Sequence, residues 1–197
     1  MSKSCRIYFA LWLAVGPAAA WLPAATNAVP PTRANYTIKS WGTKEGLPQS
    51  AVIAMTQTRD GYLWLGTLNG LVRFDGIRFT VFDEGNTPEL GSSRIVHLFE
   101  DSRSNLWVGT ETAGIKLIKN GRISDVGLGR GSSEGRLLGA CEDSGGAVWL
   151  YTADGQLCRD RDGRVDVWSH EAQRFSSCRA VFAEKSRLWV GVNWGLF

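Results

Sequence analysis

The side chains in this sequence whose types could carry out acid–base chemistry are two pairs of adjacent carboxylates. Glu100 with Asp101, and Glu142 with Asp143, have the composition of a general acid and its base, but each pair directly precedes a short polar turn. A carboxylate at that position accepts hydrogen bonds from the N–H groups of the turn. We therefore predict that these four residues cap turns and do not catalyse proton transfer.

The two histidines do not form a reactive cluster either. His97 falls in the apolar segment RIVHLFE, so we predict a packed, hydrogen-bonded histidine in the core. His170 is followed by Glu171, but adjacent side chains do not converge on one point. Neither histidine belongs to a group with metal-ligand spacing. The sequence therefore predicts no catalytic residue, no metal and no cofactor.

Four tryptophans recur at nearly equal intervals and indicate a repeated structural unit. Trp64, Trp107, Trp149 and Trp189 each stand in a short apolar segment, as in YLWLGT and NLWVGT. Their separations fall within or close to the range of about 40 to 50 residues that is typical of propeller blades. The segment DGYLWLGTLNGLVRFDG, residues 60–76, is therefore predicted to be scaffold.

Each repeat contains the signals of four antiparallel strands. A buried apolar run is followed by a polar turn, then by the tryptophan strand, where glycine occurs after the indole in three of the four copies and allows close backbone approach. A third strand ends at DG or NG, which is a strong hairpin signal. The predicted fold class is all-β, with propeller blades of four antiparallel strands near residues 46–83, 92–127, 135–169 and 176–197.

Residues 41–82 carry a specific resemblance. The stretch WGTKEGLPQSAVIAMTQTRDGYLWLGTLNGLVRFDGIRFTVF is similar to the two-component regulator propeller repeat, whose pattern runs through GLPQ, DGYLWLGT and RFDG. The likeness extends more loosely over residues 36–197. The third repeat departs from the pattern, with Tyr151 in place of the glycine after the tryptophan and Gln156 in place of Leu71.

The resemblance implies a sensor rather than an enzyme. Members of that family carry an exported propeller as the extracytoplasmic sensor of a larger membrane protein, often a hybrid histidine kinase or a diguanylate cyclase. Such full-length relatives are membrane-anchored and dimeric, and the propeller itself is not the kinase. The resemblance also implies rings of about seven blades. The fourth repeat stops at its third strand, so we expect an incomplete, truncated propeller.

The N-terminal residues predict export. A basic start at Lys3 and Arg6 precedes an apolar run and small residues, so residues 1–28 are predicted to be a cleaved signal peptide and residues 29–35 a linker. The expected location is the periplasm, with no membrane span after the signal peptide. No repeat carries a basic stripe, which argues against a nucleic-acid partner.

Three cysteines follow the signal peptide, at positions 141, 158 and 178. An odd number in an oxidising compartment leaves at least one thiol unpaired. Their positions within the repeats differ, so we predict buried thiols and not a repeated disulfide.

The loops separate a predicted binding end from a tight-turn end. Turns built on RDG, SGG, DG and NG leave little room for recognition, whereas the links between blades and before the third strands are longer. Variable loops on a rigid scaffold are favoured places for ligands. The predicted ligand-binding residues, for a small solute or an oligosaccharide, are Gln49, Asn69, Asn86, Glu111, Arg130, Asp154, His170, Arg174 and Trp194.

A secreted propeller enzyme is the alternative. Streptogramin lyases and glycosidases such as sialidases are also propellers, and DSGGAVW is similar to a sialidase aspartate box. The spacing differs, however, since Asp143 precedes Trp149 by six residues and the box requires five. A lyase would need a histidine with a neighbouring acid, for which His170 is the candidate. We therefore favour a binding module.

Overall fold

The computed structural model describes residues 37–128, 135–168, 178–185, 187–192 and 195–196. The chain divides into two compact units, Met1–Ile38 and Lys39–Phe197, and every described strand belongs to the second unit. The predicted signal peptide and the linker lie outside the described residues, so their assignment stays a prediction.

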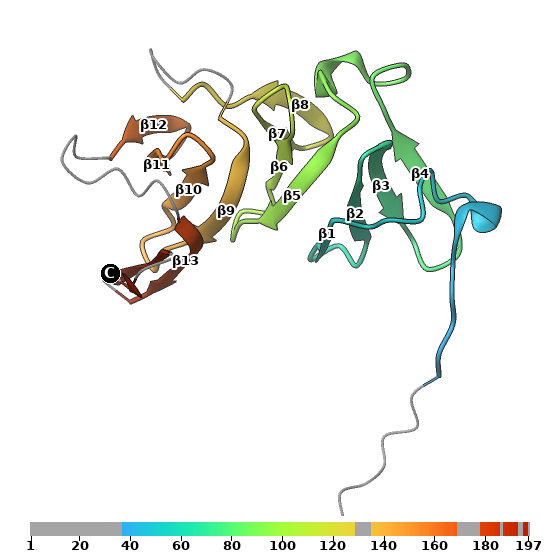
Figure 1. Cartoon of the computed structure of the whole chain (residues 1–197), viewed down its shortest axis with the longest axis horizontal. Helices are drawn as coiled ribbons and strands as arrows, with labels where there is room; N and C mark the ends of the chain where they lie inside the picture. The colour runs from blue at the N-terminus through green and yellow to red at the C-terminus, as the bar shows by residue number, and fades with distance from the viewer. Residues whose placement is uncertain (1–36, 129–134, 169–177, 186, 193–194, 197) are drawn as a thin grey trace, which may run out of the picture. The chain divides into compact units, whose positions relative to one another are not determined.

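The second unit consists of successive antiparallel sheets, which confirms the all-β prediction (Figure 1). The first sheet contains β1 (Ala54–Gln57), β2 (Leu63–Thr67), β3 (Gly70–Phe74) and β4 (Phe79–Phe82). The second contains β5 (Ile95–Glu100), β6 (Leu106–Thr110), β7 (Ile115–Lys119) and β8 (Arg122–Asp125). The third contains β9 (Leu137–Glu142), β10 (Val148–Thr152), β11 (Leu157–Arg161) and β12 (Arg164–Val167). The fourth contains β13 (Cys178–Glu184), β14 (Arg187–Val192) and β15 (Gly195–Leu196).

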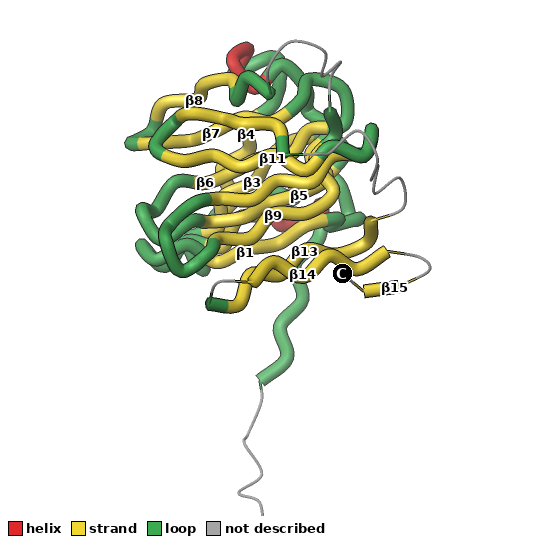
Figure 2. Tube along the Cα trace, turned by 90° about the vertical axis from the view of Figure 1, so that its left-hand side faces the viewer, coloured by secondary structure: helices red, strands yellow, loops and turns green. Residues whose placement is uncertain are grey.

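Each sheet follows the order of the chain, because every connection is a hairpin between neighbouring strands. Two short 3₁₀ helices, η1 (Thr43–Glu45) and η2 (Pro88–Leu90), precede the first and second sheets. The first strands, β1, β5, β9 and β13, contact one another in succession along the inner side. Figure 2 shows that the axes of the strands in the different sheets are roughly aligned. The sheets therefore stand side by side as blades in an open arc (Figure 1).

One pattern of packing repeats between the blades. The tryptophan strand alternates, so that its indole faces the next sheet while the aliphatic residues beside it face the previous one. Trp107 packs in one buried cluster with Val148 and Leu150 of the third sheet. Trp149 packs in the same way with Val190 and Val192 of the fourth sheet. We call these two sides of a sheet its tryptophan face and its aliphatic face.

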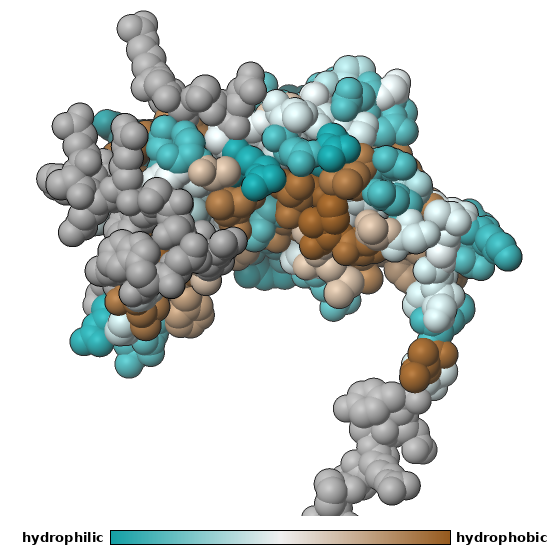
Figure 3. Space-filling view, viewed as in Figure 1, coloured by the Kyte–Doolittle hydropathy of each residue, from teal (hydrophilic) through white to brown (hydrophobic). Residues whose placement is uncertain are grey.

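The seam between the first two sheets follows the same pattern. Trp64 packs at the edge of a cluster that contains Leu106 and Val108 of the second sheet. Figure 3 shows hydrophobic side chains gathered along this seam. Leu90, which ends η2, is fully buried in the same cluster. The linking segment between two blades therefore contributes a leucine to the core between them.

In the first and second sheets, the glycine after the tryptophan lies close to the next sheet. A Cβ added to Gly109 would stand 2.7 Å from Cβ of Leu137 and 3.0 Å from Cβ of His97. A Cβ on Gly66 would stand 2.9 Å from Ile95 Cγ2. These distances are shorter than van der Waals contact, so the predicted role of glycine in close approach is confirmed.

The departure at Tyr151 is compensated within its own sheet. Tyr151 is buried against the fourth sheet, and its partner across the ladder to β9 is Gly139. In the second sheet the arrangement is reversed, with Gly109 on β6 opposite His97 on β5. The third sheet therefore has its large residue on the tryptophan strand and its small residue on the first strand, which is the reverse of the second sheet. The distance between neighbouring sheets is kept.

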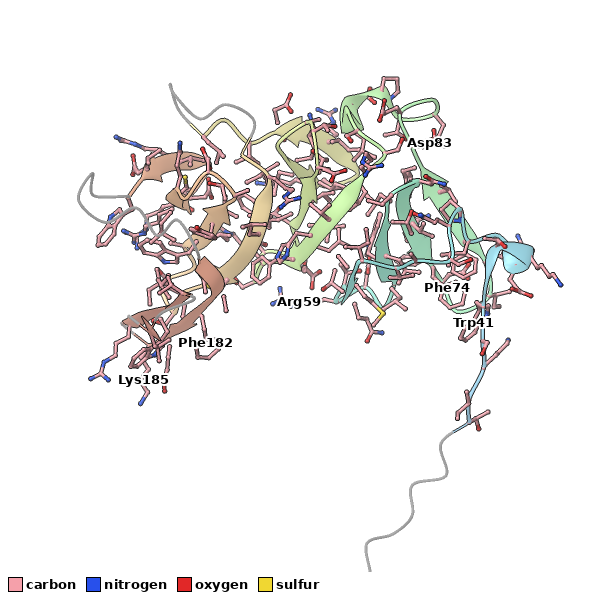
Figure 4. The ribbon with its side chains drawn as sticks, in the orientation of Figure 1. Trp41, Arg59, Phe74, Asp83, Phe182 and Lys185 are labelled. Atoms are coloured by element: carbon pink, nitrogen blue, oxygen red, sulfur yellow. The ribbon has the colours of Figure 1, made fainter. Side chains whose placement is uncertain are left out.

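Among the residues that the structure describes, no sheet covers the aliphatic face of the first sheet, and the segment before β1 covers part of it. Leu47 packs in a cluster with Leu65 and Val72. Trp41 meets Phe74 edge-on, with ring centroids 5.2 Å apart. Figure 4 shows Trp41 and Phe74 on the side of the first sheet that faces away from the second. Among the described residues, no helix is long and apolar enough to cross a membrane.

Candidate functional site

The predicted binding residues at the interblade-loop end mostly make contacts within the protein. Gln49 accepts a hydrogen bond from the Leu68 N–H at 2.9 Å. Asn86 accepts one from the Asp83 N–H at 3.0 Å and donates one to the Val81 carbonyl, also at 3.0 Å. Both side chains therefore hold the loops on which they stand.

Glu111 is the predicted residue that the structure brings to a neighbouring sheet. Its carboxylate pairs with Arg94 of its own repeat and lies 4.0 Å from Arg136 of the next repeat. The hydrogen bond from Arg94 is the main reason that the pKa of Glu111 is lowered. Two arginines around one carboxylate leave a positive charge at this point of the loop end.

The other predicted residues divide into two groups. Asp154 accepts a hydrogen bond from the Thr152 hydroxyl in its own turn, and the Asn69 side chain is exposed in the link between β2 and β3. Arg130, His170, Arg174 and Trp194 lie outside the described residues. The loop-end assignment therefore stays a prediction.

Of the four carboxylates that were predicted to cap turns, the two aspartates cap the turns of their own sheets. Asp101 accepts hydrogen bonds from the N–H groups of Arg103 and Asn105, each at 2.9 Å. The Asp143 carboxylate likewise accepts the N–H groups of Gly145 and Ala147. Neither aspartate is therefore free to act as an acid or a base.

The same aspartates also hold the repeated tryptophans. The indole Nε1–H of Trp107 donates to Asp101 at 3.0 Å, and that of Trp149 donates to Asp143 at 2.9 Å. Burial opposes ionisation of Asp101, but the hydrogen bonds from Asn105 and Trp107 outweigh it and lower its pKa. The side-chain and backbone hydrogen bonds have the same effect on the pKa of Asp143. In both of these repeats the aspartate stands six positions before its tryptophan, whereas the fourth repeat has Ala183 at that position.

The neighbouring glutamates connect one sheet to the turn of the previous one. Glu100 accepts the backbone N–H of Arg59 at 3.1 Å, from the turn of the first sheet. The Glu142 carboxylate accepts the backbone N–H of Ser102 at 2.6 Å, from the turn of the second sheet. In each acidic pair the aspartate therefore caps the turn of its own sheet, and the glutamate accepts a hydrogen bond from the turn of the previous sheet.

The first sheet departs from this arrangement at its tryptophan. Thr58 stands six residues before Trp64, where the second and third sheets have aspartate. The Thr58 hydroxyl is bound to Asp60 at 2.6 Å and the Tyr62 carbonyl at 3.2 Å. Among the described residues, none accepts a hydrogen bond from the Trp64 indole.

A cleft opens beside this indole, between the outer parts of the first and second sheets. Its volume is about 520 Å³. The first sheet contributes Thr58, Asp60, Trp64, Arg73, Thr80 and Phe82, and the second contributes Glu100, Ser104, Leu106, Ile118, Asn120, Gly121 and Ile123. Turn residues of both sheets line it, so the cleft lies at the tight-turn end. The turns at this end are tight, as expected, and the cleft lies between the two sheets.

Arg73 gives the cleft its positive charge. It pairs across the ladder with Trp64, and its guanidinium lies over the rings of Tyr62 and Trp64, 4.6 Å and 6.0 Å from their centroids. Phe82 stacks on the Trp64 ring from the same face of the sheet, with the ring centroids 5.7 Å apart. Leu117 occupies the position of Arg73 in the second sheet. An aromatic surface, a cation and two carboxylates therefore meet in one cleft.

The sequence analysis missed Trp64 and Arg73 as candidate site residues. Trp64 was assigned to packing along with the other repeated tryptophans. A position-by-position comparison of the repeats contains part of the missing signal, since Thr58 stands where the second and third repeats have aspartate. Arg73 is not distinctive, because Arg159 occupies the same position in the third sheet and lies over Trp149.

The remaining reactive groups are part of the core. Burial lowers the pKa of His97, which lies in β5 where the third sheet comes closest. Cys141 and Cys158 are free thiols, and burial raises the pKa of each to about 11. Among the residues that the structure describes, no group of three metal-ligating side chains comes together.

Comparison with known proteins agrees with the repeat and with the fold. The family model described as two component regulator propeller matches residues 46–69 and 89–112, which include the tryptophan strand of the first repeat and that of the second. Two segments of this chain therefore match the two-component regulator propeller repeat. A histidine kinase from Formosa agariphila, P4, is 42% identical over 59 residues. That match covers 30% of this chain and 4% of the kinase.

Solved structures share this arrangement of sheets. The extracellular domain of a putative one component system from B. thetaiotaomicron has a TM-score of 0.64 at 23% identity, over 80% of this chain and 22% of that one. Virginiamycin B lyase from Staphylococcus aureus has a TM-score of 0.57 at 16% identity, over 72% of this chain and 49% of that one. This chain thus spans half or less of each relative, and at these identities the likeness concerns the fold.

Proposed function

We propose that this chain is the solute-binding propeller of an exported two-component-type sensor. The family of its repeats and the fold that it shares with extracellular sensor domains support this proposal. In this proposal residues 1–28 direct export to the periplasm, and other parts of a membrane-anchored protein produce the output. The propeller itself binds the solute.

The observation that carries the proposal is the indole of Trp64 in its cleft. Trp107 and Trp149 are bound by aspartates, whereas Trp64 retains an unused N–H donor at the wall of a cavity. Among the described residues no group accepts a hydrogen bond from this N–H, so the indole can donate to a ligand in the cleft. Concave sites with an apolar wall and a few convergent polar groups are typical ligand sites.

The side chains of the cleft suit a small polar solute with one apolar face. Trp64 and Phe82 offer aromatic surface, and Arg73 adds donors. Asp60 and Glu100 offer carboxylate oxygens as acceptors, and hydroxyl groups come from both sheets. A hydroxylated ring, such as the end unit of an oligosaccharide, can use donors and acceptors together while one face lies on an indole.

The cleft also touches the contacts that connect two blades. Glu100 lines the cleft and accepts the N–H of Arg59 in the first turn, while the Arg59 guanidinium donates to the Asp101 carbonyl. Figure 4 shows Arg59 at the seam between the first and second sheets. A solute bound to Glu100 would therefore change how these two blades are held together.

The test is a binding screen followed by matched variants. The purified chain is titrated with monosaccharides, oligosaccharides, amino acids and organic acids, and binding is measured by calorimetry and tryptophan fluorescence. For a solute that binds, Arg73→Gln is expected to weaken binding at least tenfold, which corresponds to about 1.4 kcal/mol. Arg164→Gln is the matched control, because Arg164 is an exposed arginine of the third sheet that pairs with Asp166.

The same experiment distinguishes the two ends of the propeller. Asn69→Ala and Asp154→Ala change the interblade-loop end and leave the cleft intact. If only these variants weaken binding, the solute binds at the loop end, and the cleft is rejected while the sensor function stands. If no solute of any class binds, the proposed function itself is rejected.

Within this proposal the chain is a binding module and not an enzyme. The acidic pairs that most resemble a catalytic constellation accept hydrogen bonds from their own and neighbouring turns. The measurement that opposes this view is turnover of a bound solute that disappears in the His170→Ala variant. Binding without turnover agrees with it.

A further inference from the structure

The β7–β8 hairpin of the second sheet carries two cations that no described carboxylate neutralises. Lys119 and Arg122 are directly opposite each other across the ladder and flank the turn Asn120–Gly121. Both residues are exposed, and neither forms an ion pair within the part of the chain that the structure describes. Like charges directly opposite each other in a sheet are unfavourable. An anion bound at this hairpin would relieve that repulsion.

The hairpins of the neighbouring sheets bring a carboxylate to the same place. In the first sheet the equivalent residues are Asp75 and Arg78, which have opposite charges and share a backbone hydrogen bond. In the third sheet they are Arg161 and Arg164, and Arg164 pairs with Asp166 at 3.3 Å. The hairpin of the second sheet, with the sequence KNGR, contains no acidic residue. Its two positive charges are therefore not a shared feature of these three blades.

A groove connects this hairpin to the cleft beside Trp64. The groove has a volume of about 620 Å³ and is lined by Lys119, Asn120, Arg122, Ile123 and Ser124. Asn120 and Ile123 also line the cleft. Ile123 lies on the aliphatic face of the second sheet, whereas Lys119 and Arg122 lie on its tryptophan face. The groove therefore crosses β8, the outer strand of the sheet (Figure 1), and a ligand that fills both must be longer than one ring.

The charges of the cleft and the groove are separated along this path. The carboxylates Asp60 and Glu100 stand in the β1–β2 turn and at the end of β5, on the inner side of the cleft. Lys119 and Arg122 stand on the outer side, beyond the β7–β8 turn. The inner side thus offers acceptors to hydroxyl groups, and the outer side offers positive charge to an anion.

We propose, on the basis of the function proposed above, that the cleft binds an acidic oligosaccharide. One hydroxylated ring lies on Trp64, and the chain continues over the hairpin, where a carboxylate or sulfate group binds Lys119 and Arg122. The arginine can bind such an oxyanion through two parallel N–H donors. The Asn120 amide and the Ser124 hydroxyl supply further donors in the groove.

The test compares acidic oligosaccharides with neutral counterparts of the same length. The purified chain is titrated in a calorimeter with uronic acid oligosaccharides and their methyl esters, and with sulfated oligosaccharides and their desulfated forms. An acidic chain is expected to bind about tenfold more tightly than its neutral counterpart. The two series distinguish a carboxylate from a sulfate. The difference should shrink at high salt, because salt screens exposed charges.

Variants of the hairpin locate the source of this preference. The double variant Lys119→Gln and Arg122→Gln should remove it, so that acidic and neutral chains bind alike. Arg161→Gln with Arg164→Gln is the matched control, since these residues hold the same positions in the third sheet, and it should keep the preference. All four residues are exposed, so both double variants are expected to fold, and circular dichroism checks this.

The outcomes separate this inference from the proposed function. Equal binding of acidic and neutral chains, or a preference that survives the double variant of Lys119 and Arg122, overturns the inference and leaves solute binding in the cleft intact. Arg73→Gln should weaken binding of both forms, because Arg73 lines the cleft. Binding of the acidic chain that Arg73→Gln does not change also overturns the inference, since the anion would then bind apart from the cleft. If no solute binds at all, the proposed function is rejected as well.

Discussion

At the scale of single residues, the carboxylates of this protein are structural because the fold surrounds them with donors. Asp101 is fully buried and accepts from two backbone N–H groups, an amide and an indole. A buried carboxylate is tolerated only when its hydrogen-bonding capacity is used in this way. The value of such a residue to the protein is therefore stability.

The Asp101→Asn variant tests this at one atom. The amide group cannot accept from every donor around it, so we expect a loss of about 3 kcal/mol in unfolding free energy at pH 7. The folded pKa of Asp101 lies below the ordinary value of 3.8. Its contribution is therefore present above that value and is lost as the pH falls through the folded pKa. Urea unfolding at several pH values should show the difference between wild type and variant shrinking below about pH 4.

Asp166→Asn is the comparison for that measurement. Asp166 is exposed and pairs with Arg164 at 3.3 Å, and an exposed ion pair contributes about 0–1 kcal/mol. A loss in Asp101→Asn no larger than in Asp166→Asn would contradict the structural role of Asp101.

The buried thiols give a second test at this scale. Since burial raises the pKa of Cys141 and Cys158 to about 11, few thiolates exist at pH 8. In a chain with Cys5→Ser and Cys178→Ser, we expect no labelling by a thiol reagent at pH 8 within an hour, and full labelling in denaturant. Rapid labelling of the folded chain would show that these seams open readily.

At the scale of elements, the distance between sheets depends on one small residue in each seam. Glycine supplies it on β2 and β6, whereas in the third sheet Tyr151 takes that position and Gly139 on β9 supplies the space. The pair of strands, and not the single strand, is therefore the unit that fits against the next sheet.

Gly109→Ala measures how closely two sheets fit. The added methyl group would stand 2.7 Å from Leu137 Cβ, so one sheet must move, and we expect a loss of about 1–3 kcal/mol in unfolding free energy. Gly127→Ala is the matched control, because a Cβ there meets nothing within 4 Å. Equal unfolding free energies of the two variants would mean that the two sheets can move apart at no energetic cost.

At the scale of the whole molecule, stability should decrease toward the ends of the arc. The second and third sheets are covered on both faces, and every residue of β6 and β10 is buried. The fourth sheet is covered on one face. In repeat proteins each unit gains stability mainly from its direct neighbours, so the ends should open first.

Hydrogen exchange checks this gradient. Amides of β6 and β10 should exchange most slowly and those of β13 and β14 most rapidly, since local opening exposes the least covered units first. Uniform protection across the four sheets would indicate a single cooperative unit instead.

The sequence predicted the blades well, because their signals are local. The recurring tryptophans, the DG and NG hairpins and the glycines each act within a few residues, and the strands follow them. The cleft was not predicted, because it depends on Trp64, Arg73 and Glu100 coming from two sheets. The loss of one aspartate at Thr58 is visible in the sequence, but its effect appears only when the indole and the next sheet are placed together.

The exchange between Tyr151 and Gly139 limits how such proteins can be recombined. Moving β10 alone into the second repeat would put a tyrosine beside His97 and leave no space for either. Transplanting β9 and β10 together would carry over both the tyrosine and the glycine that makes space for it. Chimeras built by shuffling these blades should therefore be cut in the loops between repeats, and breakpoints inside a hairpin should yield insoluble products.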